Sequence, residues 1–225
     1  MDLSGRKVLV VDDVRFTRMT LVKMLCQFGE PTVFEAADGE EGLAKLEGEA
    51  AGTACVITDL AMPKLDGLGM LKAIRSGHGA IPRDLLVIML TGHSGFDPVG
   101  SALLLDVDAF LPKPASRQAL KNCLDRVFQA RQSQGTIGDP ERYRAVELSS
   151  IGADAEMVPE STGPRHEQPV MLSTLPVDSV LSRDLLFSNG RLLLRAHTRL
   201  NARVVDRLRE LARLAELPET IWIFA

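Results

Sequence analysis

The chain has 225 residues, of which 45% are apolar, and its formal net charge is −4. This length and composition suit a globular protein with one medium and one small domain, and the net charge gives no general attraction to nucleic acid. No apolar run is long enough to span a bilayer and the N-terminal segment is not a signal peptide, so we expect a cytoplasmic protein without membrane contact.

The first 132 residues alternate short β-rich runs with helical apolar spacing, and we take them as one domain. The expected strands are 7–11, 32–36, 54–58, 85–90 and 109–111, and helical spacing occurs at 16–26, 68–75 and 117–132. This alternation predicts an α/β doubly wound fold with a five-stranded parallel sheet covered by helices on both faces. The ligand site of such a fold lies at the carboxyl ends of the strands.

The same spacing predicts which side chains are buried. One apolar face is expected in the first helix, and in the second helix Arg75 is expected to face outward. The three cysteines have no CxxC spacing and are expected to be reduced core residues. The first face consists of Phe16, Met19, Val22, Leu25 and Cys26, and the other two cysteines are Cys55 and Cys123.

Residues 133–169 are rich in Gly, Ser, Pro and acidic side chains, which predicts a flexible linker with room for one helical turn near 139–148. Residues 170–225 are expected to form a small α+β module. Asn189-Gly190 predicts a hairpin, Asn201 predicts a helix N-cap, and 220–225 predicts a closing strand. The expected helix face consists of Val204, Val205, Leu208, Leu211 and Ala215.

Charged and hydroxyl side chains stand at the ends of the predicted strands. Asp12 and Asp13 end the first strand, Asp59 the third and Thr91 the fourth, and Lys113 follows the fifth. These ends meet at one rim of a parallel sheet. Clustered carboxylates repel one another unless a hard cation lies between them, and carboxylates with water suit Mg²⁺. A lysine and a threonine hydroxyl suit the oxygens of a phosphoryl group that arrives on a carboxylate, so Asp59 is interpreted as a nucleophile.

Residues 5–131 resemble the receiver domain of two-component response regulators. The resemblance rests on the order of these residues, together with the loop MPKLDG at 62–67 and the pair Lys113-Pro114. The resemblance implies a flavodoxin-like receiver fold and phosphorylation of Asp59 by a histidine kinase or phosphotransfer protein. It also implies Mg²⁺ bound by Asp13, Asp59 and the backbone carbonyl of Ala61, with Asp12 acting through water.

The resemblance further implies contacts to the phosphoryl oxygens and a conformational switch. Thr91 and Lys113 would contact the phosphoryl oxygens, and Lys113-Pro114 would be a cis bond. Phe110 matches the switch aromatic that turns inward when Thr91 moves, although it also fits an ordinary core position. Ala61 and His93 stand where the family sets phosphoryl lifetime; Ala61 suggests a persistent phosphorylated state, and the effect of His93 stays open.

The segment 179–211 resembles the small hairpin-and-helix module found beside HD-type phosphodiesterase domains. No His-Asp pair occurs in the chain, so we expect no phosphodiesterase activity and do not expect the protein to be an enzyme. We expect the module to bind an unidentified downstream protein or to form a homodimer. DNA binding is an alternative, supported by Arg199, Arg203, Arg207, Arg209 and Arg213. The arginines are expected mainly on the solvated side of one helix, and the segment has little room for a helix-turn-helix. A receiver that acts as a phosphate sink is the third possibility.

Overall fold

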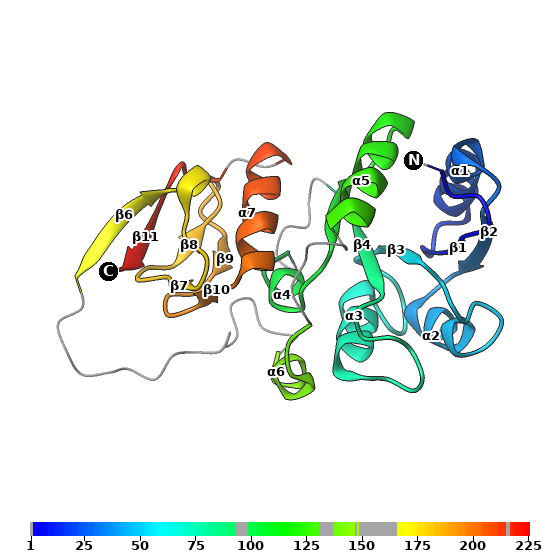
Figure 1. Cartoon of the computed structure of the whole chain (residues 1–225), viewed down its shortest axis with the longest axis horizontal. Helices are drawn as coiled ribbons and strands as arrows, with labels where there is room; N and C mark the ends of the chain where they lie inside the picture. Colours follow the sequence, from blue (N-terminus) through cyan, green and yellow to red (C-terminus); the bar gives the residue numbers. More distant parts are fainter. Residues whose placement is uncertain (1, 93–98, 131–136, 147, 149–165, 215–216) are drawn as a thin grey trace. The chain divides into compact units, whose positions relative to one another are not determined.

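The computed structural model describes residues 2–92, 99–130, 137–146, 148, 166–214 and 217–225. The chain forms two compact units (Figure 1). The N-terminal unit comprises Met1–Gly95 and Val107–Pro140, and the C-terminal unit comprises Phe96–Asp106 and Glu141–Ala225. The segment Phe96–Asp106 therefore groups with the tail, although it lies inside the expected first domain.

A five-stranded parallel sheet forms the centre of the N-terminal unit, in the order β2-β1-β3-β4-β5 (Figure 1). This order is that of the flavodoxin-like doubly wound folds, so the predicted fold class is confirmed. All neighbouring strands pair in parallel. The strands are β1 (Lys7–Val11), β2 (Thr32–Ala36), β3 (Cys55–Asp59), β4 (Leu86–Thr91) and β5 (Ala109–Pro112).

Helices cover both faces of this sheet. Side chains at alternate strand positions, such as Val8 and Val10, share a buried cluster with residues of α1 and α5. On the other face, Gly42 of α2 lies against Met70 of α3 and Val11 of β1, so α2 and α3 meet over the sheet. The helices of this unit are α1 (Arg15–Leu25), the 3₁₀ turn η1 (Cys26–Phe28), α2 (Gly39–Glu47), α3 (Gly67–Ser76) and α5 (Arg117–Ala130).

The apolar face predicted for the first helix is wrong in part. Leu21 and Leu25 are buried, whereas Phe16 is 78% exposed and Met19 is 42% exposed. Cys26 is also exposed, so it is not a core cysteine. Apolar residues occur on two sides of α1, and spacing along one helix does not say which side the sheet covers.

Arg75 is fully buried, which corrects the expectation that it faces outward. Its guanidinium donates to the backbone carbonyls of Arg83 and Leu85 at 2.6 and 2.8 Å and to the Asp108 carboxylate at 2.7 Å. Asp108 Oδ2 also accepts the N–H of Val87 at 2.8 Å. Burial of the charge is possible because the acceptors surround it.

The C-terminal unit contains short antiparallel pairs. β8 pairs with β9 around Asn189-Gly190, and β7 pairs with β10 outside them, so the predicted hairpin is confirmed as the inner of two nested hairpins. β11 pairs with β6 as a closing ladder. The elements are α4 (Val99–Leu104), α6 (Pro140–Arg144), β6 (Glu167–Met171), the 3₁₀ turn η2 (Leu172–Thr174), β7 (Ser179–Val180), β8 (Leu185–Leu186), β9 (Leu192–Leu194), β10 (Arg199–Leu200), α7 (Ala202–Leu214) and β11 (Thr220–Phe224).

α6 is the helical turn for which the sequence left room near 139–148. The first residues of β6 also fall within the segment expected to be a linker. Asn201 caps α7 as predicted, since its Oδ1 accepts the N–H of Val204 at 2.9 Å. Four of the five residues of the predicted α7 face are buried: Val204, Val205, Leu208 and Leu211. The fifth, Ala215, lies outside the described residues.

Arg207 is buried rather than solvated, which corrects its predicted position. It forms an ion pair of 2.5 Å with Glu210, one turn along α7. Arg209 donates to the backbone carbonyl of Leu175 at 3.0 Å.

Among the helices that the structure describes, none combines the length and the apolar character that a bilayer crossing requires.

Candidate functional site

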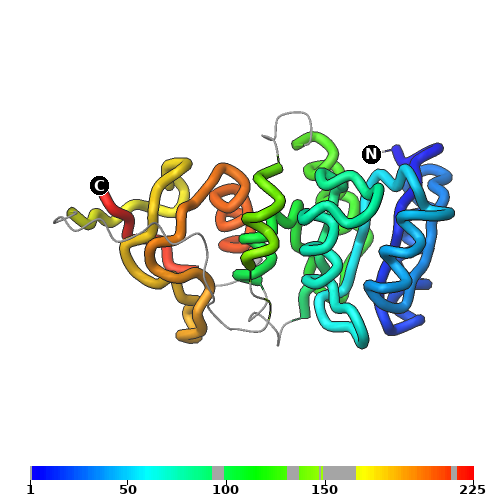
Figure 2. Tube along the Cα trace, turned by 90° about the horizontal axis from the view of Figure 1, so that it is seen from below, coloured from blue at the N-terminus to red at the C-terminus, as the bar shows by residue number. Residues whose placement is uncertain are grey.

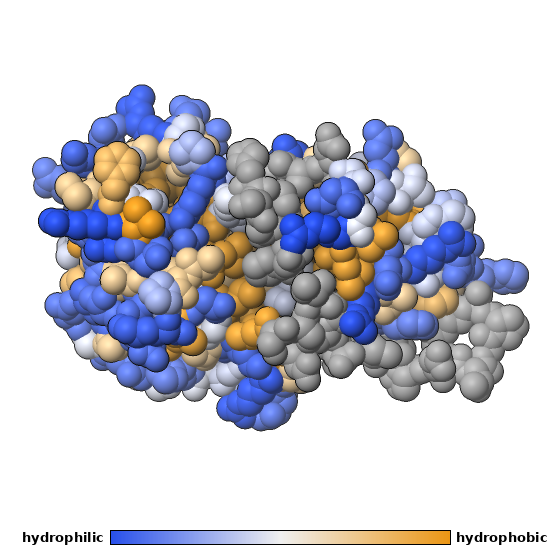
Figure 3. Space-filling view, turned by 180° about the vertical axis from the view of Figure 1, so that it is seen from behind, coloured by the Kyte–Doolittle hydropathy of each residue, from blue (hydrophilic) through white to orange (hydrophobic). Residues whose placement is uncertain are grey.

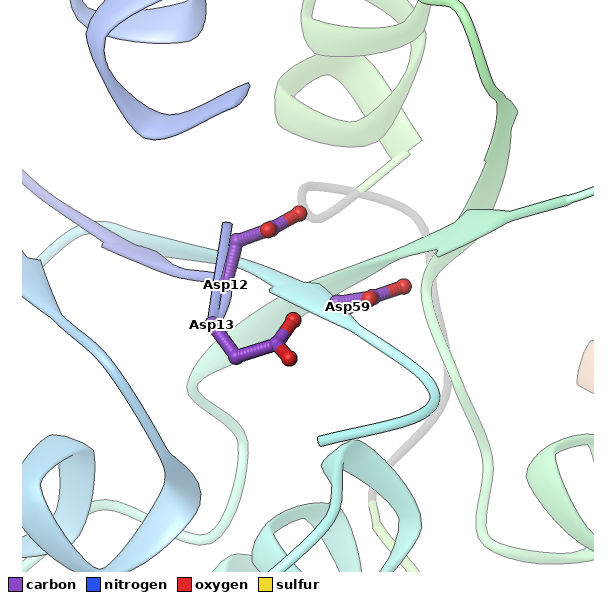
Figure 4. Close-up of side chains that lie close together, drawn as sticks. All are labelled: Asp12, Asp13 and Asp59. Atoms are coloured by element: carbon purple, nitrogen blue, oxygen red, sulfur yellow. The ribbon is translucent and has the colours of Figure 1, made fainter. Parts of the chain in front are cut away.

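Three carboxylates lie together where β1 and β3 end. Asp12 and Asp13 directly follow β1, Asp59 is the last residue of β3, and the register places Val11 opposite Thr58. An oxygen from each carboxylate lies within 4.8 Å of the others (Figure 4). Asp12 is buried, Asp59 is partly buried and Asp13 is exposed. The predicted acidic cluster is therefore present in the structure.

Lys113 bridges two of these carboxylates. Its Nζ lies 2.8 Å from Asp12 Oδ2 and 2.8 Å from Asp59 Oδ2. Its backbone N–H donates to the carbonyl of Thr91 at 2.7 Å, which joins the ends of β4 and β5. The Lys113-Pro114 bond is cis, as the resemblance implied.

Burial and the ion pairs of Lys113 have opposite effects on the pKa values of the site residues. Burial raises the pKa of Asp59 above its usual value, and the hydrogen bond and charge of Lys113 offset this only in part. Burial lowers the pKa of Lys113, but its hydrogen bonds to Asp12 and Asp59 outweigh that effect and the net pKa is raised. Lys113 therefore stays protonated and supplies one fixed positive charge among the carboxylates.

The loop after β3 fixes the Asp59 backbone and side chain. The N–H of Leu60 donates to Asp59 Oδ1 at 2.8 Å. Asp66 caps α3 by accepting the N–H of Gly69 at 2.7 Å. A Cβ at Gly67 would lie 2.0 Å from the Asp59 carbonyl oxygen, so only glycine allows this close approach. The Asp66-Gly67 part of the loop motif thus positions Asp59.

Arg18 supports the acidic pair and was not among the residues predicted from the sequence. Its Nη1 donates to the backbone carbonyl of Asp12 at 2.6 Å, while its Nε lies 3.3 Å from Glu35 Oε2. Asp12 Oδ1 also accepts the N–H of Val14 at 2.8 Å. The available signal was an arginine in the first turn of the helix that follows the acidic pair.

Of the other predicted site residues, the structure describes Thr91, Ala61 and Phe110. Thr91 is the last residue of β4 and pairs with Pro112, so it lies at the same edge of the sheet, and it is only 8% exposed. Ala61 is exposed in the loop after β3, and its role as a carbonyl ligand stays a prediction. Phe110 is 2% exposed, and its switch role stays a prediction. His93 lies outside the described residues.

The acidic cluster fits a magnesium ion. Mg²⁺ prefers oxygen ligands, binds through a small number of carboxylates and keeps several waters. Asp12, Asp13 and Asp59 supply carboxylate oxygens, and the exposed Asp13 leaves the cluster open to water. The donor set therefore matches this metal better than a softer one.

A sequence model of the response regulator receiver domain family matches residues 8–125 of the chain. The chain belongs to this family. The Helicobacter pylori chemotaxis protein CheY1 is 36% identical over 122 residues, which are 54% of this chain and 96% of that protein. A probable chemotaxis protein CheY of Rhizobium etli is 33% identical over 124 residues, which are 55% of this chain and 93% of that protein.

A solved complex of CheX, CheY, beryllofluoride and Mg²⁺ from Borrelia burgdorferi is similar with a TM-score of 0.50 and 29% identity, covering 56% of this chain and 90% of that chain. The receiver is thus CheY-like, and the family match ends at residue 125. The likeness of the tail to a module beside HD-type phosphodiesterases stays a prediction.

Proposed function

We propose that this receiver protein is a cytoplasmic phosphoacceptor of a two-component phosphorelay and not an enzyme with a substrate of its own. A histidine kinase or phosphotransfer protein would phosphorylate Asp59. The observation that carries this proposal is the Lys113 ammonium, which lies 2.8 Å from carboxylate oxygens of both Asp12 and Asp59. This arrangement places a positive charge where an incoming phosphoryl group brings negative oxygens.

The two oxygens of Asp59 are placed differently. Oδ1 accepts the Leu60 N–H, whereas Oδ2 faces Lys113. We infer that Oδ2 attacks phosphorus, so that a P–O bond forms while the P–N bond of the donor phosphohistidine breaks and the imidazole leaves with a proton from solvent. Lys113 then exchanges its contact with Oδ2 for a phosphoryl oxygen, and the Thr91 hydroxyl contacts another.

The carboxylates of Asp12, Asp13 and Asp59, with the carbonyl of Ala61, would hold Mg²⁺. When bound, Mg²⁺ neutralises charge on the oxygens of the transferring group. The solved Borrelia complex supports a magnesium ion at this site, because it contains a similar CheY together with beryllofluoride and Mg²⁺.

A groove beside the site suits the phosphodonor protein. It has a volume of about 370 Å³, and its lining includes Phe16, Leu90 and Lys113. Phe16 is 78% exposed. On the face shown in Figure 3, hydrophilic residues predominate among the coloured ones, with apolar residues between them. An exposed aromatic beside the acceptor is typical of a protein-binding surface.

We further propose that the C-terminal unit passes the signal on through protein contacts, to a downstream protein or a second copy of the chain. Two of the five α7-region arginines that favoured DNA binding have partners within the unit, because Arg207 pairs with Glu210 and Arg209 donates to Leu175. These two charges are not presented as a basic stripe for phosphates.

Beryllofluoride binding followed by ¹⁹F NMR tests the proposal on the purified full chain. A bound resonance that requires Mg²⁺ is expected for the wild type and is expected to be absent from Asp59→Asn. Asp125→Asn, which changes a carboxylate paired with Lys121 on α5, is the matched control and should bind normally. A bound resonance in Asp59→Asn would reject Asp59 as the acceptor.

A further inference from the structure

The loop after β3, residues 60–66, carries the predicted carbonyl ligand Ala61 and is anchored at both of its ends. At its start a backbone N–H of the loop donates to Asp59, and at its end Asp66 caps α3. Between these two anchors Ala61 and Lys64 are exposed, so burial in the core does not fix them. The middle of the loop therefore depends on contacts with a neighbouring segment.

That neighbouring segment is residues 36–39, which join β2 to α2. The N–H of Gly39 donates to the carbonyl of Leu65 at 2.8 Å. The two backbones approach so closely that a Cβ on Gly39 would lie 2.6 Å from this carbonyl oxygen. Beside this hydrogen bond, Lys64 Nζ lies 2.5 Å from Asp38 Oδ2. Two adjacent residues of the loop are therefore tied to two adjacent residues of the segment.

The Asp38 carboxylate is fixed on one side and holds the loop on the other. It is only 4% exposed, and its Oδ1 accepts the Glu41 N–H at 2.9 Å and so caps α2. The Glu41 N–H and then Lys64 lower the pKa of Asp38, and Asp38 raises the pKa of Lys64, so both groups are charged near neutral pH. A carboxylate fixed by a helix cap is thus a firm anchor for the lysine of the loop.

The backbone of Lys64 requires such an anchor. Its φ is +59°, in the left-handed region that a lysine rarely adopts. A backbone of this kind persists only where surrounding contacts stabilise it. The ion pair with Asp38 and the hydrogen bond from Gly39 are contacts of this type. They stabilise the turn that lies three residues after Ala61.

The same segment also contacts the acidic pair. The N–H of Asp12 donates to the carbonyl of Ala36 at 3.2 Å. Residues 36–39 therefore join the strand end that carries the acidic pair to the loop that carries Ala61. Figure 2 draws these residues in blue and the loop in light blue to cyan, within the N-terminal unit. The placement of the carbonyl relative to the carboxylates depends on this connection.

We propose that Asp38 and Lys64 are positioning residues for the magnesium site, an inference that rests on the proposed function. They act through the loop and not as ligands. Their ion pair, with the hydrogen bond from Gly39, holds the loop so that the carbonyl of Ala61 is already in place beside the carboxylates. Without the pair, metal binding includes the cost of ordering the loop, and the affinity falls.

Two single substitutions separate positioning from a purely electrostatic effect. Lys64→Met removes a positive charge, and Asp38→Asn removes a negative charge while it keeps a good N-cap for α2. Electrostatics alone would strengthen Mg²⁺ binding in Lys64→Met and weaken it in Asp38→Asn. Loss of positioning should weaken binding in both variants by about three- to fivefold, which is the range that a partly exposed ion pair contributes. Calorimetric titration of the full chain with Mg²⁺ measures the affinity.

A double variant and a conservative variant test whether the ion pair itself is responsible. Asp38→Asn combined with Lys64→Met should bind Mg²⁺ about as well as either single variant, because each change removes the same contact. Lys64→Arg keeps a cation for Asp38 and should retain the affinity of the wild type. Lys121→Met is the matched control, since it removes a lysine paired with Asp125 at 2.7 Å on α5, and it should leave the affinity unchanged.

Hydrogen exchange of the Mg²⁺-free protein gives a readout that does not depend on the metal. The amides of residues 60–66 should exchange about fivefold faster in Lys64→Met than in the wild type. Gly39→Ala disturbs the same contact without a change of charge and should give the same two effects. Its control is Gly48→Ala, whose Cβ would lie in ordinary contact, 3.4 Å from the carbonyl oxygen of Ala44. If Gly39→Ala does not fold, Lys64→Met decides.

The outcomes separate the inference from the proposed function. Mg²⁺ binding in Lys64→Met that equals or exceeds that of the wild type would overturn the inference and leave the proposed phosphorylation intact. Unchanged exchange of the loop in Mg²⁺-free Lys64→Met would also overturn it, because the loop would then not depend on the ion pair. Absence of Mg²⁺ binding in the wild type would reject the proposed function and the inference together.

Discussion

The two units of this protein arrange their strands differently, and the difference explains where the charged side chains of the candidate site meet. In the N-terminal unit, five parallel strands have their carboxyl ends on one rim, where Asp12, Asp59 and Lys113 meet. In the C-terminal unit, strands pair two by two in antiparallel ladders, so the ends of the described strands point both ways. The first arrangement gathers charged side chains at one edge of a sheet, which the proposed phosphorylation requires.

The units also differ in how they bury charge. Arg75 is surrounded by the Asp108 carboxylate and two backbone carbonyls and joins α3 to two other segments of its unit. Arg207 pairs with Glu210, one turn along its own helix. Removal of Arg75 would therefore deprive more buried acceptors of a donor than removal of Arg207, and each such loss costs stability. The following predictions test this comparison, from the largest expected effect to the smallest.

Asp59→Asn should have the largest effect, which is a loss of phosphoryl uptake by the N-terminal unit. The amide is a far weaker nucleophile, so phosphoryl uptake from a phosphorylated kinase or a small phosphodonor should fall by about 1,000-fold or more. Labelled phosphate retained on the protein measures the loss. The unfolding of the C-terminal unit, followed by the fluorescence of Trp222, which is the sole tryptophan in the sequence, should not change. Residual uptake close to wild type would place the acceptor elsewhere.

Arg75→Ala should lower the free energy of unfolding by about 3–5 kcal/mol, because it leaves the Asp108 carboxylate buried without its cation. Arg207→Ala is the matched change in the other unit and should cost less, about 2–3 kcal/mol, since only the Glu210 carboxylate loses a donor, whereas Arg75→Ala also removes the donor of two backbone carbonyls. Urea unfolding followed by circular dichroism measures both. Equal losses would remove the contrast between the units.

Lys113→Met should strengthen Mg²⁺ binding by about tenfold, because the ammonium that neutralises Asp12 and Asp59 no longer competes with the metal. The phosphorylated protein should at the same time lose the contact that holds a phosphoryl oxygen. Mg²⁺ titration by calorimetry gives the affinity. Arg183→Ala, which breaks an ion pair with Glu167 in the C-terminal unit, should leave it unchanged. Weaker Mg²⁺ binding in Lys113→Met would contradict this account.

The helix caps should differ in their response to pH. The Glu41 backbone N–H and then the Lys64 ammonium hold the pKa of Asp38 below 3.8. The ionised carboxylate therefore stabilises the folded state above that pH, and this contribution is lost as the pH falls through the lowered pKa. Asp38→Ala should cost about 1 kcal/mol near neutral pH and less below about pH 4.

Asn201→Ala removes the neutral cap of α7 and is the control for this pH dependence. It should also lower the free energy of unfolding by about 1 kcal/mol. Because the amide of Asn201 does not titrate, the loss of this cap should cost the same at every pH. Urea midpoints at several pH values measure both variants. A constant difference between Asp38→Ala and the wild type would show that the charge of Asp38 contributes nothing.

The sequence alone determined the features that depend on local pattern. Strand spacing predicted the five-stranded parallel sheet, and the strand-end residues predicted the cluster of Asp12, Asp13 and Asp59 with Lys113. The Asn-Gly turn and the Asn201 cap were predictable for the same reason, because short stretches of backbone and side chain decide them.

Only the tertiary structure decided which face of each helix is buried and to which compact unit each element belongs. Phe16 and Arg75 had misleading local patterns, because burial of an apolar or charged side chain depends on partners distant in sequence. The same holds for α4, which sequence assigns to the receiver and which packs on β9 through a single glycine. The contact of Gly100 with Leu193 joins residues about ninety positions apart, and no local periodicity records it.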